Sequence, residues 1–111
     1  EAARVAIERC IQRGERLVTS AEVLQEILHR YVAIKRADAI PAALQALAGV
    51  VDEVFPVEAV DVMQARDVLL TRPQMSARDA LHVAVMTRRG VERILSFDAG
   101  FDVVAGLERL S

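Results

Sequence analysis

The sequence is poor in cysteine, in aromatic residues and in long apolar runs. Its single cysteine, Cys10, excludes an internal disulfide and fits a protein of the reducing cytosol. No apolar run approaches the roughly 20 residues that cross a bilayer, and no stretch resembles a signal peptide. The net charge of −2 does not indicate a nucleic-acid-binding surface, although a metal-bearing site could still bind phosphates locally. We therefore expect a cytoplasmic protein without a membrane partner.

The apolar residues that are present favour helices packed on a buried sheet. With 53% hydrophobic but only 4% aromatic residues, the core must consist of Ala, Val, Leu and Ile. A chain of 111 residues is by default a single domain, here 1–111. Hydrophobic periodicity and end signals predict these elements: a helix that ends at Gly14, a strand at 17–19, a helix after Ser20, one or two short helices in 38–51, a strand at 54–57, helices at 58–71 and 76–89, a strand at 94–97, and a short turn or strand in 103–110.

This alternation of helices and strands implies a parallel sheet with helices on both faces. Three short strands are few for so many helices. The chain also begins at Glu1, directly inside a helical pattern. We therefore expect a further strand before residue 1, which would complete the middle of the sheet.

Single carboxylates stand at the edges of elements that are predicted to be buried. Asp79 follows Ser76 by three residues, the spacing of a capping box in which the carboxylate accepts a bond from the Ser76 amide. The helix that follows has almost no polar face, so its first turn would lie at the carboxyl ends of the strands, where ligands bind. For Asp79, a backbone cap and a ligand-binding role both remain open.

Two more aspartates follow the strand at 94–97. Asp98 comes directly after it, within Asp-Ala-Gly, which is ordinary turn chemistry in which the carboxylate accepts backbone N–H bonds. Asp102 could do the same or pair with an arginine. Their position also allows them to project from the carboxyl end of the strand, next to Asp79.

A glutamate on the helix after Ser20 is a fourth candidate. On a helical wheel Glu26 lies at the margin of the apolar stripe, whereas Glu22 lies opposite its centre and is expected in solvent. The simplest role for Glu26 is an ion pair with Arg30, four residues further on. The two glutamates face roughly the same side, so the helical pattern prefers Glu26 only modestly.

The acidic residues together indicate more than each one alone. Carboxylates gathered at one edge of a sheet would repel one another, and a hard divalent cation such as Mg²⁺ or Mn²⁺ relieves that repulsion. No cluster of His or Cys competes for a softer metal, because His29 and His82 are far apart and Cys10 stands alone. The sequence also has no Gly-rich phosphate loop and no Gly-x-Ser-x-Gly segment.

Three segments resemble, in order and spacing, the conserved blocks of PIN-domain ribonucleases, and most closely the VapC-type toxins of toxin–antitoxin pairs: TSAEVLQEILHRY (19–31), SARDALHVAVM (76–86) and ILSFDAGFD (94–102). In this resemblance the family's second acidic residue falls on Glu26, the third on Asp79 and the fourth on Asp98, with Asp102 as an additional candidate. The family's central first strand, which ends in an Asp usually followed by Thr or Ser, has no counterpart in this sequence.

The resemblance implies a PIN-like three-layer α/β/α fold around a short parallel sheet, and a metal-dependent endoribonuclease. Asp79 and Asp98 would hold Mg²⁺ or Mn²⁺, and Glu26 would be a further ligand or would orient the attacking water. Arg78 could neutralise phosphate, or could simply be solvated. The resemblance also implies a small antitoxin that silences the enzyme, and a homodimer.

Two other classes of protein remain open. A catalytically inactive PIN-like interaction module would suit a chain without the first Asp. A receiver-like domain would need a lysine after a strand, and the only lysine, Lys35, is not in such a place.

Overall fold

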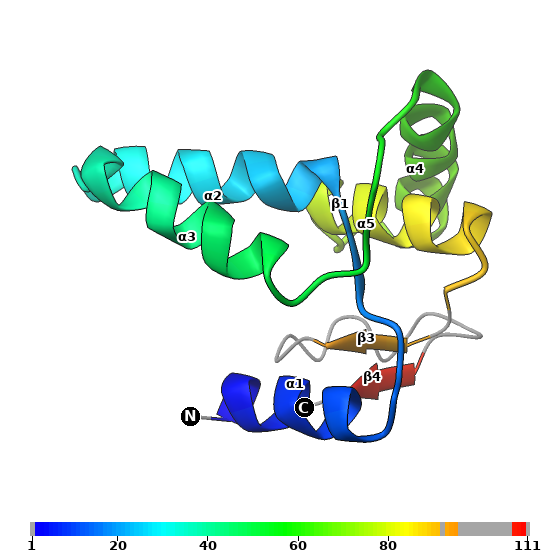
Figure 1. Ribbon diagram of the computed structural model, residues 1–111. Coiled ribbons are helices and arrows are strands. Elements are labelled where there is room, and N and C mark those ends of the chain that lie inside the picture. Colours follow the sequence, from blue (N-terminus) through cyan, green and yellow to red (C-terminus); the bar gives the residue numbers. More distant parts are fainter. Residues whose placement is uncertain (1, 92, 96–107, 111) are drawn as a thin grey trace. The chain divides into compact units, whose positions relative to one another are not determined.

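The computed structural model describes residues 2–91, 93–95 and 108–110 (Figure 1). The chain divides into two compact units, Arg16–Val57 and the remainder, Glu1–Glu15 with Glu58–Ser111. No helix in the described ranges is long and apolar enough to cross a membrane.

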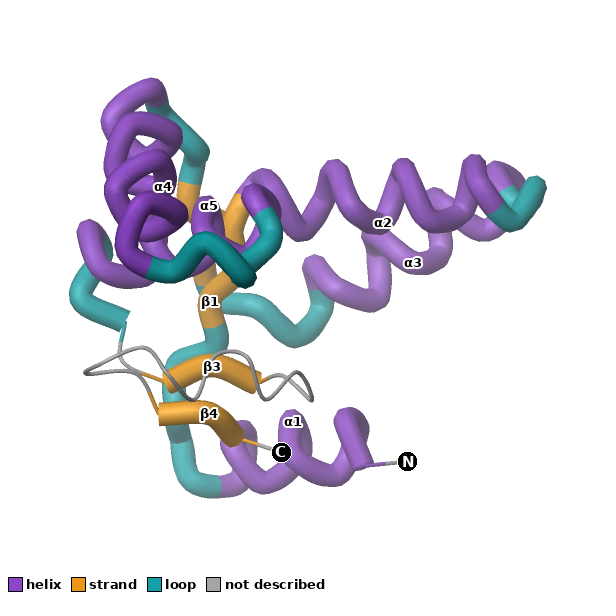
Figure 2. The backbone as a smooth tube through the Cα atoms, turned by 180° about the vertical axis from the view of Figure 1, so that it is seen from behind, coloured by secondary structure: helices purple, strands orange, loops and turns teal. Residues whose placement is uncertain are grey.

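The unit Arg16–Val57 consists of a parallel strand pair and three helical segments. Its elements are β1 (Val18–Ser20), α2 (Ala21–Ala33), the 3₁₀ helix η1 (Ala37–Ala39), α3 (Ile40–Ala48) and β2 (Glu53–Phe55). Helices α2 and α3 lie side by side (Figures 1 and 2). Neither helix has a fully buried residue. The apolar stripe of α2 that the sequence predicted is therefore only half covered.

The parallel pairing of β1 and β2 begins at Leu17 and Asp52. The Asp52 amide donates to the Leu17 carbonyl over 2.7 Å, and the Leu17 amide donates to the Asp52 carboxylate over 2.8 Å. The register then runs from Val18 opposite Glu53 to Ser20 opposite Phe55. Both strands end together, so the residues that follow them emerge at the same edge.

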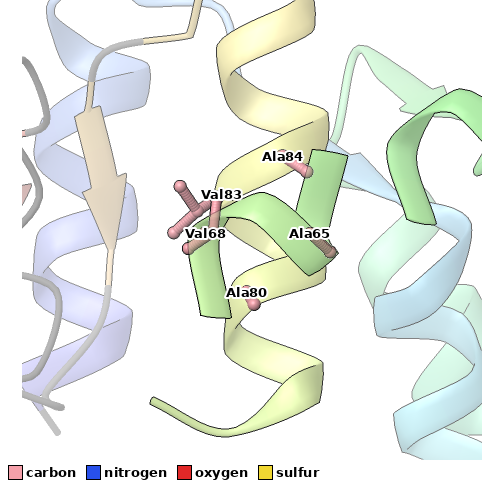
Figure 3. Packing of buried hydrophobic residues seen from close by; sticks show 5 residues of the cluster. All are labelled: Ala65, Val68, Ala80, Val83 and Ala84. Carbon is pink, nitrogen blue, oxygen red and sulfur yellow. The ribbon is translucent and has the colours of Figure 1, made fainter. Parts of the chain in front are cut away.

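The second unit contains α1 (Ala2–Gln12), α4 (Ala59–Thr71), α5 (Ala77–Arg88), and the parallel strands β3 (Arg93–Leu95) and β4 (Glu108–Leu110). Its core lies between α4 and α5. Figure 3 shows Ala65 and Val68 of α4 against three residues of α5, namely Ala80, Val83 and Ala84. These contact residues are small, which lets the two helix backbones approach closely.

Three helices end in the same way, with a left-handed residue that turns the chain. Gly14 ends α1 with φ of 71°, and Gly90 ends α5 with φ of 70°. At the end of α2 the left-handed position is taken by Lys35, with φ of 59°. Its amide donates to the Val32 carbonyl and the next amide, that of Arg36, donates to the Tyr31 carbonyl over 2.7 Å, the bonds of a Schellman turn.

The predicted order of helices and strands is confirmed, and both strand pairs are parallel. The strand predicted at 54–57 is displaced to Glu53–Phe55, because Pro56 has no N–H to donate. Residues 96–97 of the last predicted strand lie outside the described residues. Within the described ranges β1 pairs with β2, and β3 pairs with β4.

Candidate functional site

Asp79 occupies the third position of α5, in its first turn. Its backbone N–H donates to Ser76 Oγ over 3.1 Å, so the serine caps the helix as the spacing predicted. The other half of the predicted capping box is wrong: the Asp79 carboxylate accepts no bond from the Ser76 amide. Within the described residues this half-buried carboxylate has neither a hydrogen bond nor an ion pair. Among the described residues, the Asp79 carboxylate is therefore not compensated by any protein group.

The buried carboxylate of Asp61, in the first turn of α4, provides a direct contrast. The side chain of Asp61 has no exposed surface, and its Oδ2 accepts the Glu58 amide over 2.8 Å. Arg88, at the end of α5, donates from Nε to Oδ1 over 2.6 Å and from Nη2 to Oδ2 over 2.9 Å. A buried carboxylate compensated by a planar guanidinium and a backbone amide has all the partners it needs.

These contacts set the pKa values of the pair. The hydrogen bond from Arg88 lowers the pKa of Asp61 below its ordinary value, against the opposing effect of burial, and the Glu58 amide lowers it further. The hydrogen bond with Asp61 raises the pKa of Arg88 in turn. Arg88 also meets the Glu58 carboxylate over 2.9 Å. Asp61 thus stays ionised and serves to join α4 to α5.

The ion pair of Asp61 and Arg88 was not predicted from the sequence. One signal was available: Glu58 and Asp61 stand three residues apart before an apolar helix, which is the spacing of a capping box. The arginine could not be found in this way, because Arg88 is 27 residues away from Asp61. Only the packing of α4 on α5 brings them together.

The two glutamates of α2 are less different than the helical pattern predicted. Glu22 and Glu26 are both half-buried, so the expectation that Glu22 lies in solvent is wrong. Burial therefore does not divide the two glutamates between an inner and an outer face of α2. Glu26 remains a candidate site residue because of the family resemblance, not because of its exposure.

Three further residues were predicted for the site, namely Arg78, Asp98 and Asp102. Arg78 is exposed in the first turn of α5. Asp98 and Asp102 lie outside the described residues. In the part of the chain that the structure describes, no group of three or more His, Cys, Asp or Glu side chains could hold a metal ion. Asp79 and Glu26 belong to different units.

Comparison with known proteins identifies the family. A model of the PIN domain matches residues 1–107. The chain is 58% identical over 105 residues to Ribonuclease VapC13 of Mycobacterium tuberculosis, across 95% of this chain and 80% of that protein. It is 45% identical over 96 residues to Ribonuclease VapC23 of the same organism, across 86% of this chain and 75% of that protein. These matches show that the chain belongs to the PIN-domain family.

Proposed function

We propose that this protein is a metal-dependent endoribonuclease in which Asp79 is a metal ligand. The observation that carries the proposal is the state of the two first-turn aspartates. Asp61 is compensated by an arginine and an amide, whereas the half-buried carboxylate of Asp79 has no such partner within the described residues. Besides a backbone amide or an arginine, a bound cation can compensate a carboxylate near a core. The relatives' name, ribonuclease, supplies the reaction.

The donors fit a hard divalent cation, Mg²⁺ or Mn²⁺, because all of them are carboxylates. Asp79 and Asp98 would hold it, with Asp102 as an additional ligand. Glu26 would be a further ligand or would orient the attacking water. When bound, such a cation polarises the phosphodiester and makes water nucleophilic at neutral pH.

Arg78 has a separate role in this proposal. It is exposed beside Asp79 and carries the charge needed to bind a phosphate oxygen of the RNA. A positive side chain next to the cleaved bond would also offset charge that develops on the phosphate during attack.

We also propose that the enzyme is the toxin of a toxin–antitoxin pair. The resemblance to VapC-type toxins supports this assignment, together with the VapC names of the relatives. A cognate antitoxin would cover the acidic site and silence it, the toxin would pair as a homodimer, and the place of action would be the cytoplasm, where RNA is available.

The working enzyme would join β1 and β3 through one further parallel strand. The family's central strand carries the first acidic residue and lies in the middle of the sheet. The resemblance of residues 19–31, 76–86 and 94–102 to the family's blocks supports such an arrangement. The sheet of 1–111 would then form one PIN-like domain whose acidic residues meet at the strand ends.

The test is the variant Asp79→Asn, with Asp67→Asn as the matched control. Asp67 is an exposed aspartate whose side chain pairs with its neighbour Arg66. Asp79→Asn should abolish Mg²⁺- or Mn²⁺-dependent cleavage of RNA and weaken Mn²⁺ binding, while thermal stability stays equal or rises because carboxylate repulsion is relieved. Asp67→Asn should leave all three properties unchanged.

Undiminished cleavage by Asp79→Asn would contradict the ligand role and reduce Asp79 to the backbone position that Ser76 caps. Absence of both metal binding and cleavage in the wild-type protein would instead favour the second candidate, a catalytically inactive PIN-like interaction module.

A further inference from the structure

Two serines stand at the N-caps of long helices, but they behave differently. Ser76, before α5, has extended backbone angles (φ −71°, ψ 155°), and its hydroxyl accepts the Asp79 amide. Ser20, before α2, is also extended (φ −122°, ψ 163°), yet its hydroxyl makes no bond to the helix. The Oγ atom of Ser20 is buried and has no hydrogen-bond partner in the part of the chain that the structure describes.

Ser20 and the helix it precedes therefore both have unused donors. Ser20 is only 6% exposed, and a buried hydroxyl without a partner is destabilising. The first-turn amides of α2 lack the side-chain acceptor that the amide of Asp79 has. Since α2 is 13 residues long, the dipole at this end favours an anion.

The position in the fold also points to a ligand. Ser20 is the last residue of β1, in a parallel pair, and the carboxyl ends of such strands are where α/β proteins bind ligands. Ala21, the first residue of α2, is exposed, so a ligand can approach this turn. A serine side chain has one torsion with three staggered positions, so one rotation can redirect the hydroxyl.

We propose that the Ser20 hydroxyl and the first-turn amides of α2 bind a phosphate group of the RNA substrate. This inference rests on the proposed ribonuclease function and adds a substrate-binding residue to it. The hydroxyl and the amides all donate, and a phosphate oxygen accepts several donors at once. Glu22 lies half-buried in the same turn, and its carboxylate opposes the bound anion.

The experiment is a pair of variants with opposite expected effects. A fluorescent single-stranded oligoribonucleotide is titrated into the full-length protein in EDTA, where no cleavage occurs. Ser20→Ala should weaken binding about tenfold, because a hydrogen bond to a charged group is lost. Glu22→Gln should tighten binding by about threefold, the effect of removing one nearby like charge. Thr71→Ala removes a hydroxyl at the end of α4 that donates to the Asp67 and Val68 carbonyls and accepts from Arg72 Nη1, and it should change nothing.

Stability separates this role from an ordinary helix cap. Ser76→Ala should lower the melting temperature, because Ser76 caps α5. Ser20→Ala should leave it unchanged or raise it, because a buried donor without an acceptor is removed. If Ser20→Ala lowers the melting temperature as Ser76→Ala does and binds RNA like the wild type, Ser20 is a helix cap and the proposal is overturned.

A second probe, inorganic phosphate, identifies the source of the ligand. Titration followed by amide NMR should shift the signals of Ala21, Glu22 and Val23 in the wild type but not in Ser20→Ala. Phosphate binding that Ser20→Ala abolishes, with RNA binding unchanged, would assign the site to a free phosphate and overturn the RNA proposal. Loss of cleavage without any effect on these titrations would concern the acidic site alone, so the two proposals can fail separately.

Discussion

Replacing Asp61 by alanine tests how much the buried ion pair stabilises the contact between α4 and α5. The change removes the acceptor of three donors: the Glu58 amide, Arg88 Nε and Arg88 Nη2. Breaking a buried pair typically costs about 3–5 kcal/mol. The lower end applies, because Arg88 is 30% exposed and can turn to Glu58 or to water. We expect a loss of about 3 kcal/mol in the free energy of unfolding.

For a chain of 111 residues, with an unfolding entropy of roughly 0.23 kcal/mol/K, this loss lowers the melting temperature by about 13 °C. Urea unfolding followed by circular dichroism measures the loss in the free energy of unfolding, and a thermal scan measures the shift in melting temperature. Asp67→Ala is the control, because Asp67 lies on the same helix and pairs with an arginine, but both side chains are more than half exposed. That pair should contribute at most about 0.5 kcal/mol. Equal small losses in the two variants would refute the reasoning.

Acid provides an independent check on the same pair. The pKa of Asp61 is lower in the folded chain than its ordinary value of 3.8, chiefly because Arg88 donates to it. The stabilisation is therefore complete above the unfolded-state pKa and is lost as the pH falls through the lower folded-state value. The stability difference between wild type and Asp61→Ala should shrink below about pH 4. A difference that stays constant down to pH 2 would show that the charge is not involved.

Two further predictions concern α2. Glu26→Gln should abolish metal-dependent cleavage, whereas Glu22→Gln should still cleave RNA, with the tighter substrate binding proposed above. The reverse result would show that the wrong glutamate was assigned. Lys35→Gly should raise the free energy of unfolding by about 1 kcal/mol, since a left-handed backbone costs about that much for a residue with a Cβ atom. Lys35→Ala, measured by the same urea titration, should give no gain, and an equal gain from both variants would contradict the backbone explanation.

The sequence was sufficient for features that depend on neighbours along the chain. The nearly continuous apolar face of α5 predicted its burial, and Ala80, Val83, Ala84 and Val85 are buried. Gly14 predicted the end of α1, because glycine adopts the left-handed conformation without strain. The PIN-like architecture followed from three short segments whose order and spacing matched the family.

Features that depend on contacts between distant segments could not be predicted. The partner of Asp61 is known only once α4 packs on α5. The exposure of Glu22 depends on which parts of the chain pack against α2. A helical wheel contains no information about those contacts. The spacing of Ser76 and Asp79 fits a capping box and a ligand equally well. Only the geometry shows that the Ser76 hydroxyl caps α5 while the Asp79 carboxylate has no protein partner among the residues that the structure describes.

The uneven burial of the helices has a consequence for hydrogen exchange. Helix α5 has four buried residues, whereas α2 and α3 have none. Amides of α5 should therefore exchange only through global unfolding, and those of α2 and α3 through local opening of lower free energy. Asp79 lies on α5, which exchanges only through global unfolding, and Glu26 lies on α2, which opens locally. As denaturant rises, an activity that needs both residues should disappear before the fold does, at the concentration where α2 opens.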